Sequence, residues 1–130
     1  MPAYLLDTNV LIDSLNDRRN RRDMLLMLLE AGHRLCCSTV TVLELFAGLH
    51  AGEERAAIAA LSMLEVIDVD QEIAVRAGRM KYAWARKGKT LSLPDVTIAA
   101  TALQHGLVLF TDNKRDFPMP ELKLHETNER

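Results

Sequence analysis

The 130-residue sequence contains no apolar run approaching the about 20 residues that a membrane-spanning helix needs. It also shows no basic N-terminal segment followed by a long apolar stretch, because Asp7 and Asp13 interrupt the only early hydrophobic run. Secretion and membrane insertion therefore have no support in the sequence. From the absence of these signals we expect no membrane partner and a cytoplasmic location.

Cysteine is scarce, and its placement argues against a disulfide framework. The only two cysteines, Cys36 and Cys37, are adjacent on an expected strand. Successive side chains of a strand point to opposite faces, so neither a disulfide between them nor a shared metal ion is favoured. We expect both to be reduced core residues.

The sequence also lacks an excess of positive charge. It has 16 Lys and Arg residues against 18 Asp and Glu residues, a formal net charge of −2. The chain as a whole would not attract nucleic acid, so any RNA-binding surface must be local. The densest basic cluster consists of Arg18, Arg19, Arg21 and Arg22. A solvated helix start explains that cluster equally well.

The composition is that of an ordinary globular domain. Hydrophobic residues make up 48% of the chain and charged residues 26%, which excludes a disordered segment. The sequence has no repeat, no low-complexity segment and no linker. We therefore expect one domain, covering residues 1–130.

Strand and helix patterns alternate along the chain. Short apolar runs predict strands at residues 3–6, 34–38, 66–69 and 107–110, and weakly at 122–124. Helical spacing predicts helices after residue 7, over 24–29, from 39, around 58–64, over 73–84, and from 92 to a stop at 106. The helix at 24–29 is apolar all round, so we expect it to be deeply packed. This alternation predicts an α/β fold with a parallel sheet.

Four acidic residues each follow an apolar run or open a helical pattern: Asp7, Glu44, Asp95 and Asp112. The carboxyl ends of parallel strands lie along one edge of a sheet, so acids at those ends converge there. Converged carboxylates repel one another by roughly 3 kcal/mol per close pair at an effective dielectric near 20, and only protons or cations offset that. Carboxylate oxygens suit Mg²⁺ or Mn²⁺, ions that commonly act on phosphates.

Each acid also has a purely structural explanation. Asp7 has the position of a helix N-cap. Glu44 and Asp95 end the segments 41–44 and 92–95, both of which fit a capping box. Taken singly, each acid is explained by structure alone. Four of them around strand ends in so short a chain favour a shared site.

Two other functional classes compete with a metal-dependent enzyme. A phosphatase or phosphotransferase with an aspartyl nucleophile also begins with an acid after its first strand. The Asp-x-Asp pair common there is absent, since Asn9 follows Thr8. A non-catalytic RNA- or protein-binding module would keep the fold without the chemistry, and the complete set of acids argues against it.

Four segments carry a resemblance to a known family. They are residues 7–13 (DTNVLID), 42–45 (VLEL), 94–100 (PDVTIAA) and 111–117 (TDNKRDF). In order and spacing they resemble the successive motifs of PIN-domain ribonucleases, and specifically those of the VapC toxins of type II toxin–antitoxin systems. The resemblance covers residues 3–117.

The resemblance implies a three-layer α/β/α fold with a central parallel sheet. It further implies a toxic endoribonuclease that cleaves RNA phosphodiester bonds with a metal-activated water, using Mg²⁺ or Mn²⁺ in an acidic pocket. The implied partners are RNA, a second copy of the chain in a homodimer, and a neutralising VapB-type antitoxin.

The same resemblance assigns roles to individual residues. Asp7 and Asp95 match the principal metal-ligating aspartates, and Glu44 matches the second acid. Thr8 or Asn9 would orient Asp7 or the bound water.

The fourth acid is the least defined position of the motif set. Asp112 follows the last strand directly, and we choose it for that geometry as a metal and catalytic residue. Asp116 is the alternative, and Asn113 occupies a slot that is often acidic or amide.

The expected helical pair over residues 39–64 has more apolar surface than it can bury against a sheet edge. The side chains concerned are Phe46, Leu49, Ile58, Leu61 and Met63. We expect part of this surface to contact another chain, and ordinary core packing is the alternative for Leu61 and Phe46. By the resemblance, it would serve both self-association and antitoxin capture.

Overall fold

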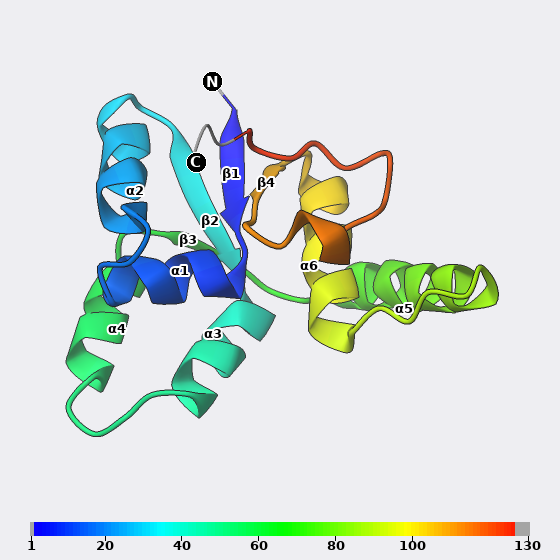
Figure 1. Cartoon of the computed structure of the whole chain (residues 1–130), viewed down its shortest axis with the longest axis horizontal. Helices are drawn as coiled ribbons and strands as arrows, with labels where there is room; N and C mark the ends of the chain where they lie inside the picture. Colours follow the sequence, from blue (N-terminus) through cyan, green and yellow to red (C-terminus); the bar gives the residue numbers. More distant parts are fainter. Residues whose placement is uncertain (1, 127–130) are drawn as a thin grey trace.

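A sheet of four parallel strands forms the centre of the computed structural model, which describes residues 2–126 (Figure 1). The strands are β1 (Ala3–Leu6), β2 (Arg34–Ser38), β3 (Glu65–Ile67) and β4 (Val108–Phe110), in the order β3-β2-β1-β4. In the register of the sheet, Leu5 lies beside Cys36 on one side and Leu109 on the other. Because all pairings are parallel, the carboxyl ends of the strands share one edge, as the sequence predicts.

Six α-helices and one short 3₁₀ helix surround this sheet. They are α1 (Thr8–Leu15), α2 (Arg21–Glu30), α3 (Thr39–Ala47), α4 (Glu54–Leu61), α5 (Gln71–Arg86), α6 (Leu93–His105) and the 3₁₀ helix η1 (Lys114–Asp116). Figure 1 shows α2 on one side of the sheet and α5 with α6 on the other. The helices α1, α3 and α6 all begin at the edge where the strands end (Figure 1). The predicted α/β fold is confirmed.

The alternation of side chains along β1 builds a separate core on each face of the sheet. Leu5 packs with α5 and α6, in a cluster that contains Ile73 and Ile98. Tyr4 and Leu6 point the other way and pack with residues of α2 such as Leu25. Complete burial of one such aliphatic side chain contributes about 1.5–3 kcal/mol, so the two clusters fix which face each helix covers.

The sequence prediction was wrong about α2. This helix begins at Arg21, three residues before the predicted start, and only Arg21 and Leu25 are buried within it. Met27 is 68% exposed, so the helix is not deeply packed. Arg21 is completely buried, so the alternative that the basic cluster is only a solvated helix start does not hold for this arginine.

Smaller differences concern the outer strands and the cysteines. The strand predicted at 66–69 lies at Glu65–Ile67, and the weak strand at 122–124 is reduced to one bridge between Leu109 and Leu124. Cys36 and Cys37 are buried free thiols, as expected. No helix within residues 2–126 is long and apolar enough to cross a membrane.

The apolar surface expected over residues 39–64 is partly interior. Phe46, Leu49 and Leu61 are partly buried against a third cluster that joins α1, α3 and α4, in agreement with the core-packing alternative. Ile58 and Met63 are each 54% exposed. The available apolar surface of this region is therefore smaller than the sequence suggests.

Candidate active site

Asp7 lies at the end of β1 and is fixed in place by two hydrogen bonds. It is the N-cap of α1, where its Oδ1 accepts from the backbone N–H of Thr8 at 2.8 Å. Its Oδ2 accepts from the hydroxyl of Thr111, also at 2.8 Å. Only 5% of the residue is exposed. Asp7 thus holds one orientation at the carboxyl edge of the sheet, and capping occupies only one of its two oxygens.

The Thr8 side chain orients Glu44. Its Oγ1 lies 2.7 Å from Glu44 Oε1 and 3.0 Å from the hydroxyl oxygen of Thr41. A hydroxyl has one proton, so Thr8 donates to the carboxylate and accepts from Thr41. Thr8 therefore orients two acids, because its backbone N–H donates to Asp7 and its hydroxyl donates to Glu44. Asn9, the alternative for this role, is exposed.

Glu44 belongs to the second turn of α3, so the capping-box explanation for this acid was wrong. The helix begins at Thr39, and Ser38 is its N-cap, whose Oγ accepts from the backbone N–H of Val40 at 3.1 Å. Because the Glu44 side chain takes no part in the N-cap and its carboxylate is turned toward Thr8, the orientation of this carboxylate has a reason other than helix stability.

Asp95 lies in the first turn of α6. Ser92 is the N-cap, and its Oγ accepts from the backbone N–H of Asp95 at 3.2 Å. Pro94 occupies the first turn, where its missing N–H costs nothing. The capping role predicted for segment 92–95 is present, and it leaves Asp95 half-buried at the edge of the sheet where α6 begins (Figure 1).

Burial and neighbouring acids raise the pKa of Asp7 and of Asp95. Burial raises the pKa of Asp7 to about 6, the hydrogen bonds from Thr111 and Thr8 oppose that shift, and the charges of Asp95 and Glu44 add to it. Burial likewise raises the pKa of Asp95, with Ser92 opposing and the charges of Asp116 and Glu44 adding. The four acids Asp7, Glu44, Asp95 and Asp116 therefore form one electrostatic group.

The structure places Asp112 away from this group. Arg21 Nε lies 3.0 Å from Asp112 Oδ2, and Arg21 Nη2 lies 2.5 Å from Asp112 Oδ1. The Asp112 side chain is only 6% exposed, and that of Arg21 is not exposed at all. Asp112 thus neutralises a buried arginine of α2, on the side of the sheet opposite to α6.

The alternating pattern of an extended chain explains the position of Asp112. Thr111 follows β4 and turns its hydroxyl to Asp7, so the next side chain points to the other face. The 3₁₀ helix η1 then brings Asp116 back to where its charge acts on Asp95. Sequence reasoning also missed Thr41 and Thr111 as supporting residues. Thr111 directly precedes Asp112 and Thr41 lies three residues before Glu44, and this proximity to two expected acids was the signal available for them.

The donor chemistry of the group suits a hard divalent cation. Within residues 2–126, no three His, Cys, Asp or Glu side chains lie close enough to enclose a metal ion as they stand. The group nevertheless consists only of carboxylates, and one of them, Asp7, has a pKa near neutrality because of burial and its acidic neighbours. A divalent cation would relieve that repulsion better than a proton, so the residues fit Mg²⁺ or Mn²⁺.

Comparison with known proteins shows the family of this chain. The PIN domain family matches residues 4–119. The chain is 32% identical to Ribonuclease VapC2 of Haemophilus influenzae over 122 residues, which cover 90% of this chain and 91% of that protein. The chain belongs to the VapC group of PIN-domain ribonucleases. The family expected from the four sequence motifs is thereby confirmed.

Other VapC relatives and solved structures extend the match over nearly the whole chain. The tRNA(fMet)-specific endonuclease VapC of Salmonella typhimurium is 31% identical over 136 residues, with 97% of this chain and 98% of that protein covered. A DNA-bound VapBC structure from Salmonella typhimurium has a TM-score of 0.79 at 31% identity, covering 96% and 98% of the two chains. A toxin–antitoxin complex from Klebsiella pneumoniae has a TM-score of 0.73 at 34% identity, covering 92% and 93%.

Proposed function

We propose that this VapC-family protein is a toxin that hydrolyses RNA phosphodiester bonds with a divalent cation held by Asp7 and Asp95, assisted by Glu44 and Asp116. The observation that carries the proposal is the buried Asp7, which Thr8 and Thr111 hold at the carboxyl edge of the sheet and whose pKa is raised to about 6 by burial, with the charges of Asp95 and Glu44 adding to the shift. An acid whose ionisation is opposed by burial and by neighbouring carboxylates is typical of a functional site, and a bound cation would favour its ionised form. The VapC relatives named ribonucleases support RNA as the substrate.

The protein's own contribution to the reaction is to hold four acids in place. A bound Mg²⁺ would supply a more acidic water and offset the charge that develops on the phosphate. Thr111 and the backbone of Thr8 fix the Asp7 carboxylate, and the Thr8 hydroxyl, itself held by Thr41, fixes Glu44. With these carboxylates held, little reorganisation is needed when substrate binds.

We assign the fourth acid to Asp116 and give Asp112 a structural role. Asp116 is exposed, and its charge raises the pKa of Asp95. Asp112 is buried in contact with Arg21, and its carboxylate oxygens both accept from that guanidinium. To bind a cation at the carboxyl edge of the sheet, Asp112 would first have to break its two hydrogen bonds with the buried Arg21.

The proposed partners are an antitoxin and a second copy of the chain. Several solved structures that resemble this chain are VapBC or toxin–antitoxin complexes, which supports a VapB-type antitoxin as partner. Leu43 and Leu93 are each 66% exposed, and they lie next to Glu44 and two residues before Asp95. Apolar side chains beside a charged site support a contact with another chain there, so we include a homodimer in the proposal.

Incubation of the purified protein with bulk transfer RNA and Mg²⁺ tests this function, with p-nitrophenyl phosphate as a parallel substrate. Transfer RNA is the first choice because a relative is named a tRNA(fMet)-specific endonuclease. We expect Mg²⁺-dependent RNA cuts and no phosphomonoester hydrolysis. Hydrolysis of the phosphomonoester alone would indicate a phosphatase, and binding of RNA without cuts would indicate a non-catalytic module.

A further inference from the structure

One segment of this chain carries a clear excess of positive charge. Residues 71–90 contain six basic residues and one acid, a net charge of +5, whereas the whole chain carries −2, so the remaining residues carry −7. The basic residues are Arg76, Arg79, Lys81, Arg86, Lys87 and Lys89. This segment forms α5 and the turn that leads to α6, and α5 projects sideways from the body of the molecule (Figure 1).

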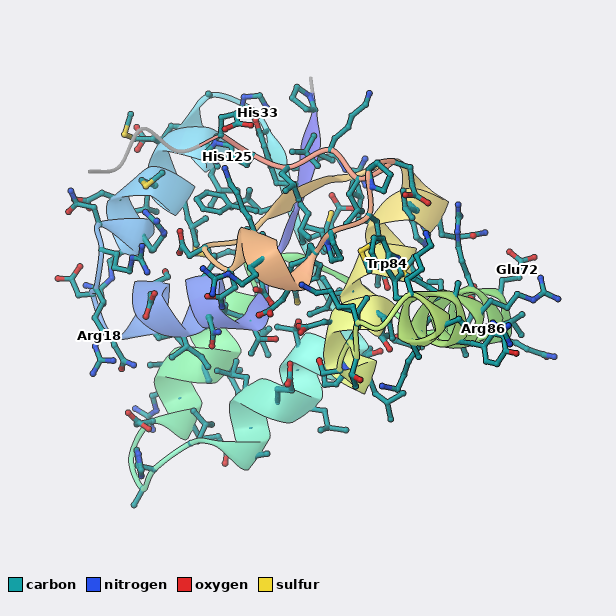
Figure 2. All side chains as sticks on the ribbon, turned by 45° about the vertical axis from the view of Figure 1, so that its right-hand side comes forward. Arg18, His33, Glu72, Trp84, Arg86 and His125 are labelled. Atoms are coloured by element: carbon teal, nitrogen blue, oxygen red, sulfur yellow. The ribbon has the colours of Figure 1, made fainter. Side chains whose placement is uncertain are left out.

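The arginines of α5 lie on its outer face. Ile73 and Ala77 are buried against α6, and Met80 and Trp84 pack against the same core. Arg76, Arg79 and Arg86 are exposed, at spacings of three and seven residues that keep them on one side of a helix. They span about 15 Å along the helix axis at 1.5 Å per residue. Figure 2 shows Arg86 on the outer side of α5 and Trp84 on the side toward α6.

These cations are not neutralised by acids of the same chain. Among residues 2–126, no carboxylate lies within 4.0 Å of the charged nitrogens of these three arginines, nor of Lys87 or Lys89. Arg76 instead donates to the amide oxygen of Gln104 at 3.2 Å. Arg76 and Arg79 also line an open hollow of about 530 Å³, to which Glu72 contributes one acid. The face is thus available to an anionic partner with several charges.

An exposed aromatic ring lies among the cations. Tyr82 is 64% exposed, and the guanidinium of Arg86 lies 5.7 Å from its ring centre and donates to its hydroxyl at 3.1 Å. Lys87 lies 4.5 Å from the ring centre of Trp84. Cations interleaved with aromatic faces are typical of surfaces that bind single-stranded nucleic acid. Only Val75 and Tyr82 are exposed large hydrophobic residues of α5, which is too little apolar surface for a helix that lies in a membrane interface.

The basic segment is connected to the acidic site. Lys89 Nζ donates to the backbone oxygen of Arg115 at 3.0 Å, and Arg115 precedes Asp116 in η1. Lys81 Nζ donates to the backbone oxygen of Leu91, which fixes the chain just before α6 and Asp95. Cations therefore continue from the outer face of α5 to the loop that carries Asp116.

We infer that the α5 basic surface, formed by Arg76, Arg79, Tyr82, Arg86, Lys87 and Lys89, binds the RNA strand that flanks the bond to be cut. The inference rests on the proposed nuclease function for the identity of the strand. The arginines and lysines contact successive phosphates, and the ring of Tyr82 stacks on a base. Such contacts supply affinity over a long substrate without reading its sequence.

The test measures binding separately from cleavage. A fluorescein-labelled 20-nucleotide single-stranded RNA of mixed sequence is titrated with protein in EDTA, where a metal-dependent nuclease does not cut, at several salt concentrations. Arg79→Gln combined with Arg86→Gln is the surface variant. The matched control combines Arg55→Gln with Lys123→Gln, which removes two exposed charges elsewhere. Circular dichroism checks that both remain folded.

We expect the surface variant to bind RNA at least about tenfold more weakly than the wild type at low salt. Its slope of log affinity against log salt should fall by about 1.4, or 0.7 for each lost phosphate contact. The control should change affinity less than about threefold. Tyr82→Ala should weaken binding about fivefold or more without changing the slope, because stacking releases no counterions.

Equal RNA affinity of the surface and control variants would overturn the inference. So would a surface variant that keeps its RNA affinity but no longer binds vesicles containing phosphatidylserine, since that would make the surface a membrane contact. If the wild type binds RNA through α5 in EDTA but cuts none in Mg²⁺, the proposed nuclease function fails while the binding surface stands.

Discussion

Arg21 and Asp112 form a buried, two-point ion pair that joins the start of α2 to the segment after β4. The Arg21 guanidinium also lies 5.5 Å from the ring centre of Phe110 in β4. Asp112 follows Thr111, which donates to Asp7, so the pair anchors the same short segment that fixes the proposed metal-binding acid. Asp112 thus helps to hold in place the segment that carries Thr111.

Asp112→Asn should destabilise the fold. The substitution removes the carboxylate that offsets the charge of a fully buried arginine, and breaking such a pair costs about 3–5 kcal/mol. Urea unfolding monitored by circular dichroism gives the free energy of unfolding. Asp17→Asn is the control, because its carboxylate is 67% exposed and 3.8 Å from Arg22. Equal stability of the two variants would show that the buried pair contributes little.

Asp116→Asn should reduce RNA cleavage about 10- to 100-fold with almost no change in stability. Asp116 is exposed, and its charge acts on Asp95 at the acidic edge. Cleavage rates are compared at a temperature well below the unfolding transition of the less stable Asp112→Asn variant. If Asp112→Asn is inactive under those conditions and Asp116→Asn cuts normally, the assignment of the fourth acid is wrong.

Asp7→Asn should stabilise the metal-free protein near pH 7. The folded-state pKa of Asp7 is about 6, above the ordinary value of 3.8, so the folded state binds the proton more tightly than the unfolded state. Its ionisation therefore costs stability as the pH rises from about 4 through 6, by about 3 kcal/mol for a shift of this size. Asparagine is an equally good N-cap and has no charge to ionise.

The stability difference between Asp7→Asn and wild type should be small at pH 4 and largest above pH 7. Thermal unfolding in EDTA across this range measures it. A difference that does not change with pH would mean that Asp7 ionises normally in the folded protein.

Thr111→Val should reduce RNA cleavage about 10- to 100-fold, because it removes the donor that holds Asp7 Oδ2 while nearly preserving side-chain volume. The control is Thr101→Val in α6, another fully buried threonine, whose hydroxyl donates only to the backbone oxygen of Thr97. Steady-state cleavage rates of the two variants are compared with wild type. Similar cleavage rates for the two variants would contradict a positioning role for Thr111.

Local patterns in the sequence were sufficient to predict much of this fold. Asp7 and Ser92 are N-caps, each at a point where a strand or loop becomes a helix. Their residue types and the neighbouring apolar runs mark these helix starts in the sequence. The αL glycine at Gly106 ends α6 as predicted, with a φ of 65° that few other residues adopt. At these positions the helix boundaries predicted from the sequence agree with the structure, whereas the capping-box pattern of segment 41–44 did not mark a helix start.

Long-range pairing could not be predicted in the same way. Nothing near Asp112 in the sequence indicates that its partner is Arg21, 91 residues earlier, and the same arginine looks like part of a solvated cluster. Likewise, Phe46 and Leu61 appear as surplus apolar surface until the third core between α1, α3 and α4 is seen. These features depend on tertiary packing, which periodicity does not encode.

The most direct test of the proposed site is RNA cleavage by Asp95→Asn, measured with Mg²⁺ in parallel with Mn²⁺ binding by calorimetry. The amide keeps the shape of the side chain but removes a charge that the cation needs, so the variant should bind Mn²⁺ weakly and cut no RNA. Its thermal stability in EDTA should equal or exceed that of wild type, since the burial that raises the pKa of Asp95 no longer opposes a charge. Full cleavage activity in the purified, folded variant would contradict the assigned site.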